Sequence, residues 1–518
     1  MKTRKTFLTV AIVMLVMTVH ALSFGAEKVP ITGPYDTLRE YLAALEARGR
    51  VLRIKEVDQD QYEGTAFVYR MLDEMGLDTS PAIAFEKVKI DGEWREGPMY
   101  GNIYCGWDTA AMVYGVEKIT NNQGEMYRAV MKKLSSFVDA GGQWKKIKPV
   151  VVDKSKAPCK EIIVTGDAVD ILKFPWFKNN PGDVGRYINT AAVFMEDPEL
   201  GRNVGTYRSQ VKGPRKIGVN PEVGQHGWVF MMKAKRRGEK VKHVALALGT
   251  DPIVYAMSST KLAELGEDEL EFAGGFLGKP VQVVKCETSD LLVPANAEMI
   301  IEGEVPMEQE DEGPYGEMFG YMGQQHKNFY MNIKAITHRK RPIFVNSFTG
   351  VDKTTHMIPW SASAFFKLKK QIPYLEDMYD PHEAIGLKIL SIDKQFPNQG
   401  IAAGQIAAGG PTGKIVIVVD KDVDVTNITE VLHAVSTRWQ PYPASLVIPR
   451  GTTFGVDPSN PERLQTSKIV IDATRQLPSE GGPKSWPPMN RALLQEKAPQ
   501  SVELVNKKWA EYWKDWTK

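Results

Sequence analysis

The sequence predicts a mixed α/β protein in which a barrel-like β-domain lies between two α/β domains. Helical and strand periodicities alternate up to residue 142, short β-branched runs broken by Gly, Pro and Asn fill residues 150–346, and helices alternate with strands from residue 350 onward. Repeated short strands are typical of a barrel or a curled sheet, and helix–strand alternation favours a partly parallel sheet. The 518 residues are enough for several domains, each with its own core.

Residues 1–26 have the layout of a secretory signal peptide. Basic side chains within residues 2–5 precede an uncharged apolar run, 7–22, and small residues follow it. The run is short for a membrane span. Residues 3–8 resemble the twin-arginine export motif for folded proteins, with Lys5 in place of the second arginine, whereas the apolar run favours the route for unfolded chains. We expect a periplasmic or otherwise exported protein, or a cytoplasmic one if this segment is misread.

The first domain is expected over residues 34–142. Thr37 and Glu40 form a capping box at the start of a helix, and Gly49 ends that helix. Further elements are expected at 51–54 (strand), 81–85 (strand) and 126–138 (helix).

The second domain, residues 150–346, is expected to consist of short strands interrupted by one helix, 227–237. Its strands are expected at 161–164, 191–194, 206–211, 244–248, 281–285, 298–304, 332–337 and 343–346.

The third domain, residues 350–518, is expected to alternate between helices and strands and to end in a tail helix at 501–516. Val, Tyr and Trp form an apolar stripe along that tail, which includes Trp509, Trp513 and Trp516. Such a stripe predicts packing on another subunit or domain, and we expect a homodimer or homohexamer. The remaining elements are helix 360–370, strand 386–392, helix 401–408, strand 415–419, helix 428–439 and strand 469–471.

Composition argues against several classes of function. The net charge is +2, and it falls to −1 without residues 1–26, so nothing favours nucleic acid or anionic lipid as a partner. Cys105, Cys159 and Cys286 have neither zinc nor redox spacing, and we expect them to be buried apolar residues.

Glu312 and Glu317 flank a Gly-Pro-Tyr-Gly core. Proline and glycine disfavour a helix, and Pro314 has no N–H for a sheet ladder, so the core must be a tight turn. A turn can aim both carboxylates at one point, where their pKa values separate into those of one acid and one base. On spacing alone, a solvated surface turn with acidic flanks is the alternative.

The run from Glu312 to Tyr321, Glu-Gly-Pro-Tyr-Gly-Glu-Met-Phe-Gly-Tyr, resembles the signature of the UbiD family of decarboxylases. Segments 290–303, 431–438 and 468–474 resemble further parts of that family, and the likeness extends from about residue 35 to near the C-terminus. The resemblance implies that the second domain is a split β-barrel-like, flavin-binding domain. It also implies prenylated FMN as the cofactor, with Mn²⁺ and K⁺.

The resemblance selects a metal and cofactor site that spacing alone would not pair. Asn203, His226 and Glu269 would hold a divalent metal that binds the cofactor phosphate. An amide oxygen, an imidazole and a carboxylate suit Mn²⁺ or Mg²⁺ better than zinc. Further cofactor contacts are expected from Gln225, His226, Ser258, Ser259, Thr260 and Lys468, of which the serines and the threonine would also hold K⁺ and the lysine would reach the phosphate.

The resemblance also implies a catalytic network of Arg208, Glu312 and Glu317. Arg208 would orient the substrate carboxylate and lower the pKa of an adjacent glutamate, Glu317 would donate the proton that replaces CO₂, and Glu312 would couple to both. Arg208 lies five residues after Asn203. Because odd spacing on a strand points side chains to opposite faces, a bulge or bend is needed for both to meet one ligand.

The sequence thus predicts a carboxy-lyase that decarboxylates an α,β-unsaturated or aromatic carboxylic acid, reversibly and without oxidation. The alternatives are a carboxylase that runs the same site in reverse and an exported binding or assembly subunit without turnover. Expected partners are a small-molecule carboxylic acid and a flavin prenyltransferase as the cofactor source. Gln225, Met318 and residues 439–443 are expected to line the pocket.

Overall fold

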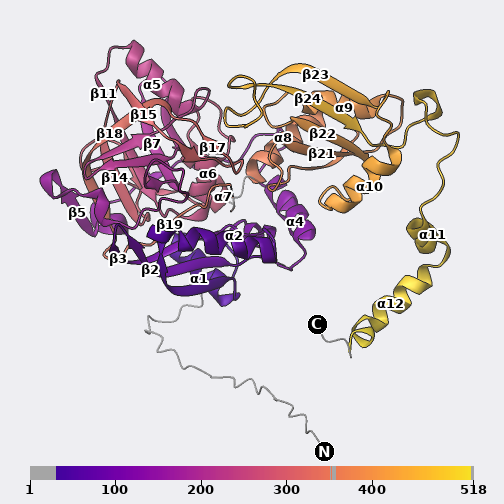
Figure 1. The fold of residues 1–518 in the computed structure, drawn as a ribbon, viewed down its shortest axis with the longest axis horizontal. Coiled ribbons are helices and arrows are strands. Elements are labelled where there is room, and N and C mark those ends of the chain that lie inside the picture. Colours follow the sequence, from indigo (N-terminus) through magenta and orange to yellow (C-terminus); the bar gives the residue numbers. More distant parts are fainter. Residues whose placement is uncertain (1–30, 351, 353–357, 515–518) are drawn as a thin grey trace, which may run out of the picture.

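The computed structural model describes residues 31–350, 352 and 358–514 (Figure 1). The leader predicted at residues 1–26 lies outside this part of the chain, as does Trp516 of the tail. Of the helices within it, none has both the length and the apolar character that a membrane crossing requires.

The N-terminal layer is a four-stranded sheet in the order β1-β2-β3-β19. β1 (Val51–Asp58) and β2 (Ala82–Ile90) are parallel, and β3 (Glu93–Gly101) runs antiparallel to β2. The helices of this layer are α1 (Leu38–Ala47), α2 (Glu63–Met75), α3 (Trp107–Val113) and α4 (Gln123–Ser135).

The start of α1 differs by one residue from the predicted capping box. The Thr37 side chain accepts the N–H of Glu40 at 3.1 Å, as predicted. The Glu40 carboxylate instead accepts the N–H of Asp36 at 2.8 Å. Sequence reasoning missed α3, because all of its residues are buried and it therefore shows no amphipathic period.

β19 (Phe344–Val345) belongs to a different sheet from the one predicted. We expected residues 343–346 to close the central domain, but Phe344 pairs with Met99 and Val345 with Tyr100 of β3, in parallel. The N-terminal sheet is therefore completed by a segment that follows the whole central domain.

The central sheet has ten strands, and it is open rather than a closed barrel. The hydrogen-bonded order of its strands begins at β6 and ends at β8, and β5 and β15 also pair with β18. Buried apolar residues fill strands such as β7, and runs of this kind predicted β5, β7, β11, β14 and part of β18, whereas β6, β10 and β15 were missed. In this order the strands are β6 (Tyr187–Ile188), β9 (Ser209–Gly213), β10 (Lys216–Val219), β18 (His326–His338), β14 (Met299–Pro306), β11 (Val241–Leu248), β7 (Ala191–Asp197) and β8 (Gly201–Thr206), with β5 (Ile162–Thr165) and β15 (Gln309–Glu312) beside them.

Three helices and two small sheets accompany the central sheet. α5 (His226–Arg236) was predicted, whereas α6 (Pro252–Ser259) and α7 (Glu269–Leu277) were missed because nearly all of their residues are buried. The small sheets are formed by β4 (Val150–Val151), β12 (Gln282–Lys285) and β13 (Leu292–Pro294), and by β16 (Tyr315–Gly316) and β17 (Met322–Gly323).

The C-terminal domain is the predicted α/β unit with a partly parallel sheet. Its strand order is β20-β21-β22-β24-β23, in which β21, β22 and β24 are parallel and the outer strands are antiparallel to their neighbours. Its elements are α8 (Ile358–Gln371), β20 (Leu375–Tyr379), β21 (Leu387–Ile392), α9 (Gln399–Ala407), β22 (Ile415–Asp420), α10 (Ile428–Arg438), β23 (Ser445–Thr452) and β24 (Gln465–Asp472).

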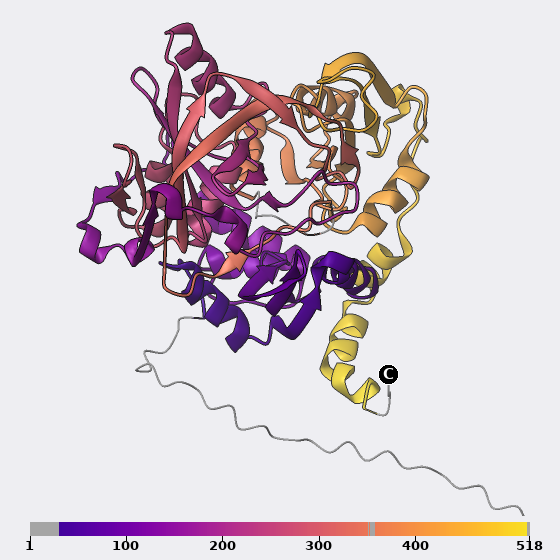
Figure 2. The ribbon, with the colours of Figure 1, turned by 60° about the vertical axis from the view of Figure 1, so that its left-hand side comes forward.

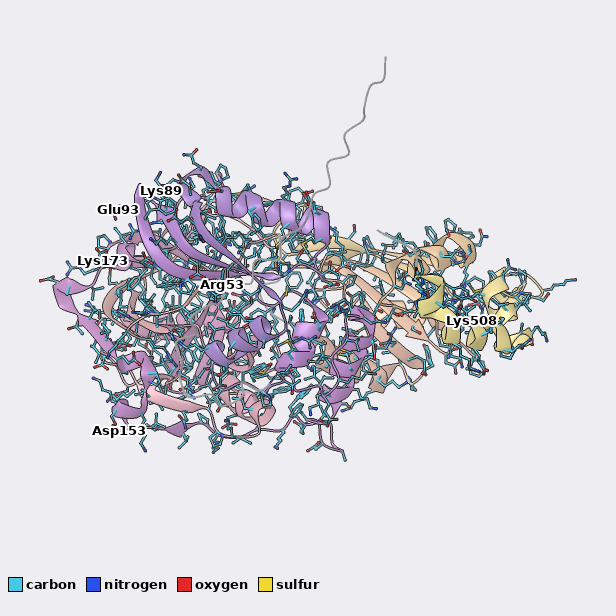
Figure 3. All side chains as sticks on the ribbon, turned by 90° about the horizontal axis from the view of Figure 1, so that it is seen from below. Arg53, Lys89, Glu93, Asp153, Lys173 and Lys508 are labelled. Atoms are coloured by element: carbon cyan, nitrogen blue, oxygen red, sulfur yellow. The ribbon has the colours of Figure 1, made fainter. Side chains whose placement is uncertain are left out.

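The tail forms two helices, α11 (Asn490–Lys497) and α12 (Pro499–Tyr512), that stand away from the body (Figure 2). Neither helix has a buried residue, and Trp509 is 55% exposed. In Figure 3, Lys508 of α12 lies at the opposite end of the molecule from Lys89 and Glu93 of the N-terminal layer. The predicted apolar stripe is therefore uncovered within the described part of this chain.

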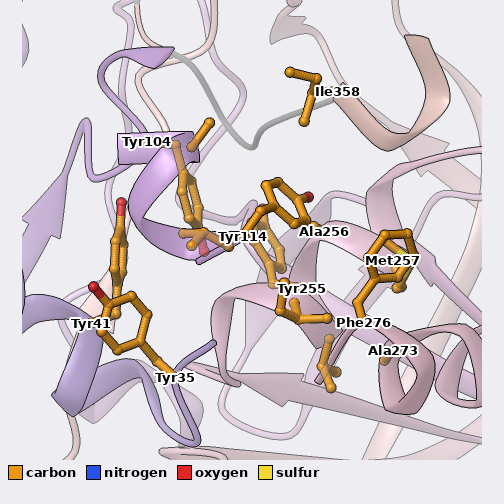
Figure 4. Packing of buried hydrophobic residues seen from close by; sticks show 14 of the residues in the cluster. Tyr35, Tyr41, Tyr104, Tyr114, Tyr255, Ala256, Met257, Ala273, Phe276 and Ile358 are labelled. Carbon is orange, nitrogen blue, oxygen red and sulfur yellow. The ribbon is translucent and has the colours of Figure 1, made fainter. Parts of the chain in front are cut away.

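An aromatic stack joins the N-terminal layer to the central domain (Figure 4). The ring centroids of Tyr41 and Tyr104 are 5.8 Å apart, and those of Tyr104 and Tyr255 are 5.9 Å apart. All three side chains are buried in one hydrophobic core. Tyr255 belongs to α6, so this core fixes the helix whose last residues include Ser258 and Ser259.

Candidate active site

Arg208 joins the two carboxylates of the signature run. Its Nε donates to Glu312 Oε1 at 3.0 Å, one terminal nitrogen donates to Glu312 Oε2 at 2.7 Å, and the other donates to Glu317 Oε1. The Glu312 side chain is only 1% exposed. A buried carboxylate needs such a bidentate partner, because an unpaired buried charge is very costly. The structure thus brings together the three residues predicted as the catalytic network.

The bend that the sequence required between Asn203 and Arg208 is a break between two strands. β8 ends at Thr206 and pairs with β7, whereas β9 begins at Ser209 and pairs with β6 and β10. The single strand predicted at 206–211 is therefore wrong. Arg208 lies in the two-residue break, where strand alternation no longer dictates the direction of its side chain.

The signature core is the predicted tight turn. β15 ends at Glu312, and Gly313 has a φ of 83°, a left-handed conformation that glycine adopts without strain. Tyr315 and Gly316 then form β16, and Glu317 follows directly, with its N–H donating to the carbonyl of Tyr321 at 2.8 Å. The turn therefore directs both carboxylates to Arg208 from opposite ends.

The surroundings of Glu317 change the acidity of its side chain. Burial raises the pKa of Glu317 above the ordinary value, although the charge and hydrogen bond of Arg208 oppose this effect. Arg208 does act in the predicted direction, but burial is the larger influence. For Arg208 itself, burial favours the neutral form, but hydrogen bonding to Glu312 and the two carboxylate charges outweigh it and raise the pKa. Arg208 therefore stays a cation, and Glu317 is a weaker acid than an ordinary glutamate.

Two tyrosines form an aromatic wall beside the cluster. Tyr187 donates its hydroxyl to Glu312 Oε1 at 3.2 Å, and its ring centroid lies 4.3 Å from that of Tyr315. The guanidinium carbon of Arg208 lies 4.9 Å from the Tyr315 ring centroid, in cation–π contact. Burial and the Glu312 charge raise the pKa of Tyr187, so its hydroxyl remains a donor. Tyr315 stands inside the signature, but nothing in the sequence pointed to Tyr187.

The three predicted metal ligands come from β8, α5 and α7. His226 Nδ1 lies 4.0 Å from Glu269 Oε1, and Glu269 Oε2 accepts the N–H of the residue after Asn203 at 2.8 Å. The hydroxyl of Tyr207 accepts the N–H of the residue after His226 at 3.0 Å and lies 3.4 Å from Asn203 Nδ2. Burial raises the pKa of Glu269, against the influence of His226. The structure thus brings these residues together from three separate elements.

The side chains of this second cluster fit a hard cation and its ligand. The set contains one histidine and one carboxylate, and an amide oxygen with non-protein oxygens would have to complete it. Among the described residues, no group of three or more His, Cys, Asp and Glu side chains is arranged to hold a metal.

The predicted hydroxyl residues lie near the same strand. The hydroxyl oxygens of Ser258 and Ser259 lie 2.9 Å and 2.8 Å from Thr206 Oγ1, at the end of β8. Thr260 Oγ1 is buried and has no hydrogen-bond partner within the described chain. A buried hydroxyl without a partner points to a missing ligand, which supports a cofactor or cation at this position.

Lys468 does not take the place predicted for it. It lies on β24 of the C-terminal sheet, and its ammonium donates to the carbonyl oxygens of Ala408 at 2.7 Å and Gly410 at 2.5 Å. The Lys468 ammonium, which we expected to reach the cofactor phosphate, is thus bound to these two carbonyl oxygens. Gln225 does precede α5 as predicted, but its amide oxygen accepts the N–H of Glu222 at 2.7 Å.

The residues predicted to line the pocket differ in their exposure and contacts. Met318 is 46% exposed and Tyr442 is 91% exposed. Trp439 donates its ring N–H to the carbonyl of Ala444 at 3.1 Å, within the C-terminal domain. Met318 lies within the signature run, whereas the distance of residues 439–443 from it depends on how two domains pack and could not be judged from the sequence.

Sequence reasoning missed a second row of charged residues beside Glu312. His326 Nε2 lies 3.7 Å from Glu312 Oε2 and 3.6 Å from Glu222 Oε1. Arg463 of the C-terminal domain forms an ion pair with Glu222. The register of β15 against β18 sets Glu312 directly opposite His326. The chain between them contains β16 and β17, so no short turn in the sequence indicated this pairing.

Two family models match the chain. The 3-octaprenyl-4-hydroxybenzoate carboxy-lyase Rift-related domain matches residues 150–352, and the C-terminal domain of the same carboxy-lyase matches residues 355–473. A phenolic acid decarboxylase of Bacillus subtilis (strain 168) is 32% identical over 501 residues, which cover 91% of this chain and 100% of the relative.

Solved structures of similar fold include two enzymes. An evolved dimeric form of the UbiD-class enzyme HmfF from Pelotomaculum thermopropionicum, in complex with prFMN, is 29% identical with a TM-score of 0.71, covering 86% of this chain and 96% of that one. The vanillic acid decarboxylase of Sedimentibacter hydroxybenzoicus is 27% identical in its open form, with a TM-score of 0.76 and coverage of 91% and 99%. In its closed form the TM-score is 0.74 at 28% identity, with coverage of 90% and 99%.

Proposed function

Because this chain belongs to the UbiD family of carboxy-lyases, we propose that it removes the carboxyl group of an aromatic or α,β-unsaturated acid, reversibly and without oxidation. The observation that carries the proposal is the guanidinium of Arg208, whose side chain is only 10% exposed, held between Glu312 and Glu317. An arginine fork matches a carboxylate, and a glutamate with a raised pKa can donate a proton.

Substrate binding requires an exchange of partners at Arg208. Its nitrogens are engaged by Glu312 on one side and by Glu317 on the other. Protonation of Glu317 removes its charge and weakens its hold on Arg208, which frees one terminal nitrogen for the substrate carboxylate. Binding of the acid is thereby coupled to proton uptake, and the bound substrate meets Glu317 in its acid form.

The reaction replaces CO₂ with a proton. A carboxylate R–COO⁻ and one proton give R–H and CO₂, with Glu317 giving its proton to the carbon that loses the carboxyl group. Prenylated FMN, when bound, would supply the electron sink that no amino-acid side chain offers. Glu312 keeps Arg208 in place throughout, since it holds two of the guanidinium nitrogens.

We place the divalent metal, Mn²⁺ in our proposal, at Asn203, His226 and Glu269. Ser258, Ser259 and the unpartnered hydroxyl of Thr260 are the proposed contacts of K⁺ and the cofactor. A bound phosphate dianion inside the protein needs such cations to offset its charge. Lys468 is left out of this set, because its ammonium is bound to backbone carbonyls.

The substrate class is drawn from relatives. One is a phenolic acid decarboxylase and another a vanillic acid decarboxylase. We therefore propose an aromatic acid with a ring hydroxyl ahead of a purely aliphatic unsaturated acid. Flavin prenyltransferase is the proposed source of the cofactor.

We further propose that the protein is exported and assembles with copies of itself. The signal-like layout of residues 1–26 supports export, and the exposed stripe on α12 supports assembly. Sequencing the N-terminus of the mature protein, with fractionation of cells with and without the twin-arginine translocase, tests the first part. An intact Met1 in the cytoplasm would reject export, and unchanged delivery without the translocase would reject the route for folded proteins.

The function is tested by expressing residues 27–518 together with a flavin prenyltransferase. The purified protein should show the absorbance of bound prenylated FMN and release CO₂ from hydroxybenzoic acids. Arg208→Ala is the matched negative control, because it leaves the metal cluster intact. Cofactor binding without any turnover, in either direction, would favour the non-catalytic binding subunit instead.

A further inference from the structure

The proposed reaction consumes one proton in every turnover, and the inference below rests on that proposed function. After Glu317 has given its proton to carbon, the Glu312–Glu317 pair must be re-protonated before the next substrate binds. Glu312 is almost completely buried. Arg208 cannot release a proton near neutral pH. The Glu317 side chain is only 12% exposed, so a more exposed group is suited to carry the proton between this pair and the solvent.

His326 lies between the pair and the surface. Its Nε2 is 3.7 Å from Glu312 Oε2, and 24% of its side chain is exposed. Burial is the largest influence on the pKa of Glu317 and raises it, whereas the charge of His326 is among the influences that lower it. The imidazole is therefore also electrostatically coupled to the proton donor.

Every polar neighbour of the imidazole nitrogens is an acceptor. Nδ1 lies 3.2 Å from the carbonyl oxygen of Gln324, and Nε2 lies 3.1 Å from Asn220 Oδ1. The orientation of the Asn220 amide is fixed, because its Nδ2 donates to Glu222 Oε1 at 3.1 Å while its Oδ1 also accepts from Asn328. A doubly protonated ring satisfies these acceptors, whereas a neutral ring leaves one nitrogen without a donor proton.

The other polar groups beside the pair and beside the His326 ring are less suited to this task. The hydroxyl of Tyr187 bonds Glu312, but the residue is buried, and burial raises its pKa far above the neutral range. Glu222 is held by Arg463 and by the Asn220 amide.

We propose that His326 is the positioning residue through which the Glu312–Glu317 pair takes up its proton from solvent. The imidazolium releases the proton on Nε2 toward Glu312 Oε2, and solvent returns a proton to Nε2. Glu312 then passes the proton to Glu317, which Arg208 holds beside it, while Arg208 keeps all of its own protons. At 3.7 Å the transfer requires a small approach of the ring or one bridging water.

The charged groups that face the ring decide its response to pH. Glu222 approaches from the loop before α5, Glu312 from β15, and Glu317 from the segment after β16. Arg463 and Arg208 face it indirectly, each bound to one or more of these carboxylates. The adjacent Lys327 pairs with Asp311 at 2.8 Å on the exposed side of the strand.

The decisive experiment compares His326→Gln, His326→Ala and the control Lys327→Gln in the cofactor-loaded enzyme. We expect kcat of both histidine variants to fall at least about tenfold above pH 7, and imidazole in the buffer to restore much of it in His326→Ala. Wild-type kcat should fall as the pH rises between about pH 5 and 8. This fall should be absent in His326→Gln. Lys327→Gln should behave as the wild type.

A second measurement does not depend on turnover. NMR titration of the histidine ring signals in cofactor-free protein, with His326 assigned by difference, should show a lower midpoint for His326 in Glu222→Gln, which removes a facing carboxylate. An unchanged midpoint, an unchanged pH profile in His326→Gln, or no rescue by imidazole would overturn the relay while leaving the function in place. A wild type that binds prenylated FMN but decarboxylates no acid would instead overturn the proposed function.

Discussion

Glu317 alternates between two partners in the proposed reaction, and its protonation decides which one it meets. As a carboxylate it competes with the substrate for Arg208, and as an acid it releases Arg208 and becomes the donor. Burial is the largest influence on its pKa and favours the acid form. One residue therefore links substrate affinity to proton supply.

Glu317→Gln should keep the cofactor and lose turnover. Glutamine preserves the shape of the side chain but has no acidic proton, so we expect kcat/KM to fall about 10²–10⁴-fold. Its absorbance spectrum with cofactor should match the wild type. Glu310→Gln, two residues before Glu312, is the control, because Glu310 pairs with Lys212 and Lys216 away from Arg208. More than about a tenth of wild-type kcat/KM, a barrier change below about 1.4 kcal/mol, would remove Glu317 as the donor.

The pH dependence of KM follows from the same residue. The acid form of Glu317 is required for binding, and its raised pKa keeps that form present to a higher pH than for an ordinary glutamate. KM for the acid should therefore rise as pH increases through that raised pKa and stay flat below it. Steady-state kinetics between pH 5 and pH 9, at constant ionic strength, measure this. A KM independent of pH would show that the substrate does not compete with the Glu317 carboxylate.

His226→Ala and Glu269→Ala should each lower manganese and cofactor content more than thermal stability. The two side chains stand 4.0 Å apart, so one cation between them is the simplest account of their position. Metal analysis and flavin absorbance of purified protein give the readout. His243→Ala is the control, since His243 is exposed on β11 of the same domain. Full metal and cofactor in both variants would reject the site.

At the scale of elements, the break between β8 and β9 creates the candidate site. Tyr207 occupies the break, and Gly205 and Gly227 leave room for its ring, since a Cβ at either glycine would lie under 3.0 Å from its hydroxyl oxygen. The same hydroxyl binds the N–H of Gly227 and approaches Asn203. Tyr207 therefore ties β8 to the start of α5, where His226 lies.

Tyr207→Phe should weaken the link between β8 and the start of α5 without creating a large cavity in the core. Loss of the hydroxyl leaves the Gly227 N–H unpaired, which costs about 1–3 kcal/mol for a buried donor. We expect a lower thermal midpoint and reduced cofactor occupancy. Tyr330→Phe, whose exposed hydroxyl lies 3.5 Å from Glu308, is the matched control and should change neither. Equal cofactor occupancy in the two variants would contradict the role of Tyr207.

Elements with a clear period were predictable from the sequence, and those without one were not. The C-terminal alternation and the turn at Gly313 follow from local chemistry, and both were found in the structure. Buried helices such as α6 lack a polar face, so no amphipathic pattern marks them. The break at Tyr207 and the position of Lys468 depend on which strands pair and which carbonyls lie nearby, information that no local pattern holds.

At the scale of the whole molecule, the C-terminal domain reaches over the candidate site. Arg463 pairs with Glu222, and the ring centroids of Phe454 and Phe319 lie 6.3 Å apart. Phe319 follows Glu317 by two residues, so the two domains meet beside the proton donor. A vanillic acid decarboxylase of similar fold has been solved in open and closed forms.

Deleting residues 501–518 should reduce the oligomer. Trp509 and Tyr512 of the apolar stripe on α12 are more than half exposed, as is Leu504 on the same helix, and we propose that a second copy of the chain covers them. Light scattering at micromolar concentration should show a smaller particle for the deletion. Lys507→Ala, on the same helix, is the control and should keep the wild-type size. A wild-type monomer, or an unchanged size after deletion, would refute the role of the tail.

The late arrival of β19 has a consequence for synthesis on the ribosome. β3 is complete by residue 101, but its partner β19 emerges roughly 240 residues later. At about 5–20 residues per second, the edge of the first sheet stays open for about 12–50 s of translation. During that interval the nascent chain presents the open edge of β3 to chaperones and to neighbouring chains. The first hundred residues are thus not a portable module, and any nascent or truncated chain that lacks Phe344 and Val345 carries an aggregation-prone edge.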